Sequence, residues 1–90
     1  MFTQIAPQKV RHSSGYIVQI GSRHAVEYYD ARCKASVEVE FGKPNAVYAS
    51  TLTAGCLSGS PLNLLDTEKA EIIQRIVEGL RAMGSSAEIY

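Results

Sequence analysis

The stretch that begins at residue 66 restricts the fold of this chain more than any other, because it carries the pattern of one amphipathic helix. Its large apolar side chains recur at helical spacing and form one broad stripe, made of Ile72, Ile73, Ile76, Val77, Leu80 and Met83. Polar residues fall on the opposite side, where Glu71 and Arg75 stand at the i,i+4 spacing of a stabilising ion pair. The pattern predicts a helix with one buried face.

The expected ends of this helix are also visible. Asp66 is the predicted N-cap, because a short carboxylate accepts hydrogen bonds from the free N–H groups of the first turn. Gly84 stands where a left-handed residue after the helix is expected. Gly79, inside the helix, is unfavourable for helix formation and indicates close approach to another element.

The residues before the helix show β patterning. Apolar Val37, Val39 and Phe41 alternate with polar residues, so this strand should turn them to a core and Glu38 and Glu40 to water. Further strands are expected at 16–20, 24–29 and 46–51, and a short terminal strand at 87–90. Residues 1–14 are either a first strand or a ragged arm, and residues 52–65 are expected to form a loop that packs down through its leucines.

These elements predict an α+β fold in one domain, residues 1–90. We expect an antiparallel meander of four to five strands packed on one C-terminal helix, followed by the short terminal strand. A single helix covers one face of such a sheet. We expect the helix to cover the face of the sheet that carries Val37, Val39 and Phe41. Glu27, Glu38 and Glu40 then lie on the opposite, uncovered polar face.

Charge and composition exclude several classes of function. Nine basic and nine acidic residues cancel, so the chain lacks the basic footprint of a nucleic-acid binder and the polybasic patch of a peripheral membrane protein. The start of the chain has no basic region followed by a long apolar run, so we expect no secretory signal, no membrane span and a cytoplasmic location.

The residues that could carry chemistry are few. Cys56 and His24 are the only plausible nucleophile and base, and an ordinary packed cysteine is the simpler interpretation. A disulfide between Cys33 and Cys56 is possible in principle, but a reducing compartment argues against it. The two histidines and two cysteines show no paired ligand spacing. We therefore expect no enzyme activity, no metal and no cofactor.

Tyrosine gives the clearest indication of a binding surface. Adjacent Tyr28 and Tyr29 point to opposite faces of their strand, so one of them should lie on the uncovered side. Exposed tyrosine is a favoured contact residue because it buries a large area at low entropic cost.

The order of features in residues 15–90 resembles a family of small bacterial immunity proteins that are encoded beside polymorphic or contact-delivered toxins. The residues that carry the likeness are the Ala46-Val47-Tyr48-Ala49-Ser50 strand, a loop with proline, the Leu65-Asp66-Thr67-Glu68-Lys69-Ala70-Glu71-Ile72-Ile73-Gln74-Arg75-Ile76 helix start, and Met83-Gly84 leading into Glu88-Ile89-Tyr90. The resemblance implies a protein that binds one cognate toxin and occludes it. Glu27, Tyr29, Glu38 and Glu40 would then contact the toxin.

A second interpretation has equal standing. The free strand face, or the edge strand at 87–90, would pair with a second copy in a homodimer, as in a structural or accessory protein of a phage or mobile element. A small enzyme that uses Cys56 and His24 is the third interpretation.

Overall fold

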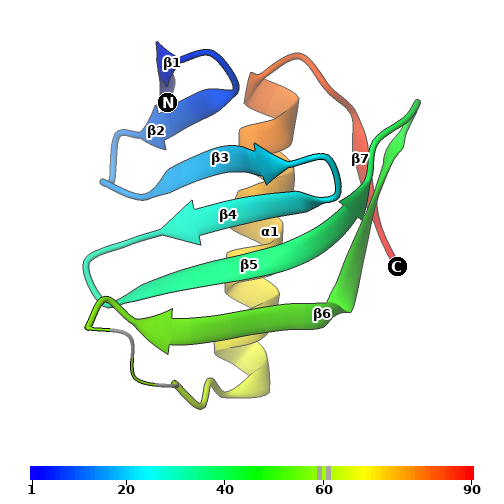
Figure 1. The fold of residues 1–90 in the computed structure, drawn as a ribbon. Helices are drawn as coiled ribbons and strands as arrows, with labels where there is room; N and C mark the ends of the chain where they lie inside the picture. The colour runs from blue at the N-terminus through cyan, green and yellow to red at the C-terminus, as the bar shows by residue number, and fades with distance from the viewer. Residues whose placement is uncertain (59, 61) are drawn as a thin grey trace.

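The computed structural model describes residues 1–58, 60 and 62–90, so Gly59 and Pro61 of the predicted loop lie outside the described residues. In these residues the chain forms one seven-stranded sheet with a single helix against one face (Figure 1). The elements are β1 (Phe2–Ala6), β2 (Lys9–His12), β3 (Ile17–Ser22), β4 (Ala25–Tyr29), β5 (Cys33–Glu40), β6 (Asn45–Cys56), α1 (Asp66–Ala82) and β7 (Ala87–Ile89). The strands lie in chain order across the sheet. The α+β prediction is confirmed.

All neighbouring strands are antiparallel except the last pair, in which β7 runs parallel to β6. Between β6 and β7 the chain crosses the back of the sheet as α1 (Figure 1), and a crossover connection of this kind lets two neighbouring strands run parallel. No helix in the described residues has the length and apolar character needed to cross a bilayer.

Residues 1–14, for which the sequence left two alternatives, form the β1–β2 hairpin and enlarge the sheet beyond the predicted meander. Val10 is buried, and the Phe2 ring lies edge-on to the rings of His12 and Tyr16. His12 and Tyr16 stack with their ring centroids 4.7 Å apart. A polar hairpin therefore joins the sheet through a small aromatic group at its inner face.

The core lies between the inner face of the sheet and the apolar stripe of α1. Val37 and Val39 are fully buried in it, as their alternation predicts, together with Ile76 and Leu80 of the helix. Complete burial of side chains of this size contributes roughly 1.5–3 kcal/mol each. Phe41 differs from the prediction: β5 ends at Glu40, and Phe41 is 37% exposed because it lies beyond the strand that would have turned it inward.

The helix begins one residue earlier than a capping Asp66 would require. The N-cap is Leu65, and Asp66 is the first helical residue, so the prediction for Asp66 is wrong. Glu68 replaces the missing cap in part, because its Oε1 accepts a hydrogen bond from the N–H of Leu65 at 3.0 Å. At the other end Gly84 has φ +90°, as expected of a residue after the helix. The Glu71–Arg75 ion pair is also present.

Strand β6 is twice as long as predicted, because it runs through residues 52–56 of the expected loop. The ladder with β5 is irregular between Ser36 and Glu38, where the Thr51 hydroxyl accepts the Glu38 N–H at 2.8 Å. The same hydroxyl donates to the Tyr48 carbonyl at 2.7 Å. The Thr51 hydroxyl thus stabilises the backbone at the irregularity. From Ser36 and Thr53 onward the two strands pair regularly again, up to Cys33 and Cys56.

Asp30 organises the connection between β4 and β5. Its Oδ1 accepts hydrogen bonds from the backbone N–H groups of Arg32 and Cys33 at 2.7 and 2.9 Å, and its Oδ2 accepts one from the Tyr28 hydroxyl at 2.7 Å. Burial alone would raise the pKa of this carboxyl, but these three donors favour the charged form and the net effect lowers it.

Replacing Asp30 with asparagine should therefore remove a pH-dependent part of the stability. A carboxyl whose pKa is lower in the folded state stabilises the fold above its unfolded pKa of about 3.9, and this stabilisation is lost as the pH falls through the folded pKa. We expect the difference in unfolding free energy between wild type and Asp30→Asn to be constant from about pH 7 to 5 and to shrink below about pH 4. Urea titrations over this range measure it. A difference that stays constant down to about pH 2 contradicts the role of the charge.

Candidate functional site

The face of the sheet opposite α1, here called the outer face, is covered by no element of the described chain (Figure 1). Strand alternation places polar residues there, because their neighbours along each strand are buried in the core. The cross-strand registers put these side chains on the outer face: Lys9, Arg11, Gln19, Glu27, Tyr29, Lys34, Ser36, Glu38, Glu40, Tyr48 and Thr53.

One end of the outer face carries carboxylates and phenols in alternation. Glu38 pairs with Tyr48 across β5 and β6, while Glu40 and Glu88 both pair with Ala46, one from each side. The Tyr48 hydroxyl donates to Glu40 Oε2 at 2.8 Å, and the Tyr90 hydroxyl donates to Glu88 Oε2 at 3.0 Å. We call Glu38, Glu40, Tyr48, Glu88 and Tyr90 the acidic–aromatic cluster.

The two phenols of the cluster are close to each other and remain protonated. Their ring centroids lie 6.1 Å apart. Hydrogen bonding to Glu40 raises the pKa of Tyr48, and hydrogen bonding to Glu88 raises the pKa of Tyr90. Tyr90 is 64% exposed and Tyr48 is half-buried, so the cluster presents aromatic surface as well as negative charge to solvent.

The negative charge of the cluster has no partner among the described residues. The ion pairs found there join Arg32 to Glu68, Lys34 to Glu27 and Arg75 to Glu71, and none of them includes Glu38, Glu40 or Glu88. Three carboxylates therefore share one end of the outer face without a neutralising cation. Such an arrangement favours the approach of a positively charged surface.

Glu27 and Tyr29, the other two predicted contact residues, are also on the outer face but form a separate network. Lys34 Nζ lies 3.4 Å from Glu27 Oε2 and 5.5 Å from the centre of the Tyr29 ring. The Tyr29 hydroxyl donates to Glu27 Oε2 at 2.9 Å. Of the adjacent tyrosines Tyr28 is buried, so Tyr29 is the one that faces outward, as alternation requires. The Glu27 charge is already compensated within the chain.

The sequence therefore identified Glu38 and Glu40 but missed their neighbours Tyr48, Glu88 and Tyr90. Glu88 and Tyr90 are two residues apart, which places both on one face of a strand. That spacing is visible in the sequence. What it cannot show is that β7 pairs with β6 in parallel, which brings this strand beside Tyr48.

The candidate catalytic pair is not assembled. The His24 carbonyl accepts a hydrogen bond from Val39 N–H, while Cys56 stands opposite Cys33. Residues 33 and 39 of one strand are about 20 Å apart. His24 and Cys56 thus lie at opposite ends of the sheet, far outside hydrogen-bond reach.

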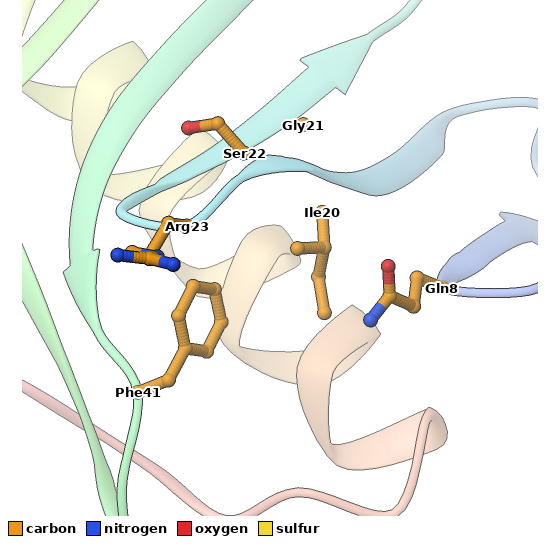
Figure 2. Close-up of a pocket in the computed structure, with 6 residues that line it drawn as sticks. All are labelled: Gln8, Ile20, Gly21, Ser22, Arg23 and Phe41. Carbon is orange, nitrogen blue, oxygen red and sulfur yellow. The ribbon is translucent and has the colours of Figure 1, made fainter.

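A hollow of about 440 Å³ lies between the β3–β4 turn, the β1–β2 turn and Phe41 (Figure 2). Its described lining residues are Gln8, Ile20, Gly21, Ser22, Arg23 and Phe41. Figure 2 shows the Arg23 guanidinium beside the Phe41 ring. The lining offers a cation, an amide and a hydroxyl next to two apolar side chains, but no acid and base pair. Its composition suits non-covalent contact better than general acid–base chemistry.

Metal ligands do not converge in the described residues, where no group of three His, Cys, Asp or Glu side chains could hold an ion. The chain was also compared with protein-family models, curated proteins and solved structures, and none of them matches it.

Proposed function

We propose that this chain is a non-enzymatic protein-binding module, and that its outer face binds the basic surface of one partner protein. The observation that supports the proposal is the acidic–aromatic cluster, in which three carboxylates without cations flank two tyrosines on an uncovered sheet. Combined with the resemblance in residues 15–90, this favours an immunity protein that neutralises a cognate bacterial toxin by occlusion in the cytoplasm.

The chemistry of the cluster suits such a partner. Toxins that act on nucleic acids need a basic surface to bind phosphate. The carboxylates of the cluster would compete with the phosphates of the nucleic acid for that surface. Opposite charge speeds association and selects the partner, while the tyrosines supply buried area once the complex forms. Glu38 and Glu40 would provide the charge, and Tyr48 and Tyr90 the aromatic contacts. Glu27 and Tyr29 would add contacts nearer the middle of the sheet.

The test requires the neighbouring gene. The proposal expects a toxin reading frame beside the gene for this chain, and it expects coexpression of the chain to restore growth of cells that produce the toxin. If the adjacent reading frames encode no toxin, or if the chain does not protect, the immunity function is wrong.

The contribution of the Glu38 and Glu40 carboxylates to toxin binding is tested by the double variant Glu38→Gln/Glu40→Gln. We expect the affinity for the toxin to fall about 100-fold, which corresponds to roughly 2.7 kcal/mol, and protection to be lost. Calorimetry or surface plasmon resonance measures the affinity, and the wild-type affinity should weaken as salt is added.

The matched control is Ala70→Lys combined with Gln74→Lys, because both residues are exposed on α1, on the opposite layer. It changes the net charge of the chain by the same amount. This control should protect like wild type. Equal loss in both double variants would show that net charge alone matters and that the outer face is not the contact.

The second candidate function is self-association through β7. This strand is at one end of the sheet order, and its Ile89 is 49% exposed, so it offers a free edge and an apolar contact. A stable dimer in sedimentation experiments that persists in Glu38→Gln/Glu40→Gln, together with no protection against a neighbouring toxin, would favour this function over the first.

A further inference from the structure

The two cysteines of the chain, which are far apart in sequence, stand directly opposite each other in the sheet. Cys33 is the first residue of β5, Cys56 is the last residue of β6, and the register pairs them. Both are free thiols. Ala35 pairs with Ala54 two residues further along, on the same face, so the cross-strand pair next to the cysteines has small side chains.

The backbone hydrogen bonds show which kind of pair they form. Cys33 donates its N–H to Asp30 Oδ1 at 2.9 Å, and its carbonyl accepts from Asp30 N–H at 3.0 Å. Cys56 donates its N–H to the Ser60 carbonyl at 2.7 Å. The cysteines therefore do not exchange hydrogen bonds with each other. In such a non-hydrogen-bonded antiparallel pair the Cα atoms are about 4.5 Å apart, which falls in the range of about 4.4–6.8 Å that a disulfide spans.

The two thiols differ in access to solvent. Cys33 is 0% exposed, whereas Cys56 is partly exposed at the end of β6. Burial raises the pKa of Cys33, and the nearby Asp30 carboxylate raises it further. A dissolved reagent consequently reacts with Cys56 first, because Cys33 is buried and its raised pKa leaves less of it as thiolate.

We propose that Cys33 and Cys56 form a thiol–disulfide modification site that a small disulfide oxidant, such as oxidised glutathione, closes into a cross-strand bond. Cys56 loses its proton to the buffer, and its thiolate attacks one sulfur of the oxidant. A mixed disulfide forms on Cys56, and one glutathione thiolate leaves. Cys33 then gives up its proton, attacks the Cys56 sulfur and releases the second glutathione. Two protein thiols are oxidised, and one small disulfide is reduced to two thiols.

The bond would tie the far end of β6 to the start of β5. It closes the chain segment from residue 33 to residue 56, which includes the whole β5–β6 hairpin, and so restricts the unfolded chain. It also anchors the point from which the chain leaves the sheet toward α1. This inference does not rest on the proposed binding function, because neither cysteine belongs to the acidic–aromatic cluster.

The experiment treats the full chain with oxidised glutathione at about pH 8, where thiols of ordinary reactivity ionise in part. Mass spectrometry after alkylation with iodoacetamide should show no free thiol and no glutathione adduct, and digestion should recover a peptide that links Cys33 to Cys56. The oxidised chain should melt at least about 5 °C higher than the reduced chain.

Two variants separate the two steps. Cys33→Ala should stop at a glutathione adduct on Cys56, and Cys56→Ala should react far more slowly. The proposal is overturned if wild type keeps a stable glutathione adduct or two alkylatable thiols, or if its disulfide joins two molecules. It is also overturned if oxidation lowers the melting temperature, because the pair would then be too strained to close in the native fold.

Discussion

Replacing Ile76 with alanine is expected to lower the free energy of unfolding by about 3 kcal/mol. Ile76 lies in the middle of the apolar stripe of α1 and has no exposed surface. It belongs to the core cluster in which the helix packs against both the central strands and the edge strand β7. Removing three of its carbons loses their burial and leaves a cavity that the rigid sheet cannot fill.

The loss would be a large part of the total, because a chain of this size has a stability of roughly 5–13 kcal/mol. Urea unfolding followed by circular dichroism measures it. The matched control is Ile89→Ala, since Ile89 is 49% exposed on β7, and the same truncation there should cost less than about 1 kcal/mol. Equal losses at the two positions would mean that α1 does not seal the core as described.

Replacing Gly79 with alanine is expected to destabilise the fold by about 2 kcal/mol, although alanine is the better helix former. A Cβ atom at position 79 would lie 2.6 Å from Val18 Cβ and Cγ2 and 2.8 Å from Cγ1. Val18 is fully buried in β3, so it cannot move aside, and the helix would have to shift away from the sheet. Here the overpacking outweighs a propensity gain of about 0.5–1 kcal/mol.

A double-mutant cycle tests this contact directly. Val18→Ala removes Cγ1 and Cγ2, two of the three Val18 carbons that crowd the new Cβ, and keeps only the Val18 Cβ. The variant Val18→Ala/Gly79→Ala should therefore be more stable than the sum of the single effects predicts, by at least about 1 kcal/mol. Additive effects would show that position 79 does not pack against Val18. If Gly79→Ala alone raised the melting temperature, the close approach of helix and sheet would be wrong.

The sequence predicted those parts of the fold that depend on the spacing of apolar and polar residues within one strand or one helix. The alternation around Val37 and Val39 gave both the strand and its buried face, and the spacing of the helical stripe gave α1 to within one residue. The prediction failed at Phe41, where the alternation continued for one residue after the strand had ended. It failed also in β6, because the small residues Ala54 and Gly55 resemble a loop and only their pairing with β5 makes them a strand.

The candidate site shows the same division. Glu38 and Glu40 were identified because they share a face of one strand, and that depends on local geometry alone. Their grouping with Tyr48, Glu88 and Tyr90 depends on the parallel pairing of β7 with β6, which joins segments on either side of the helix. The separation of His24 from Cys56, and the opposition of Cys33 and Cys56, depend equally on long-range register.

The sequence by itself thus determined the class of the fold, the helix with its buried stripe, and the acidic side of β5, because these follow from the periodicity of backbone geometry over a few residues. Only the tertiary structure decided the size of the sheet, the neighbours of each carboxylate and the partner of each cysteine. Those are set by which strands pair and in which register, and a shift of one residue between strands would turn every side chain to the other face.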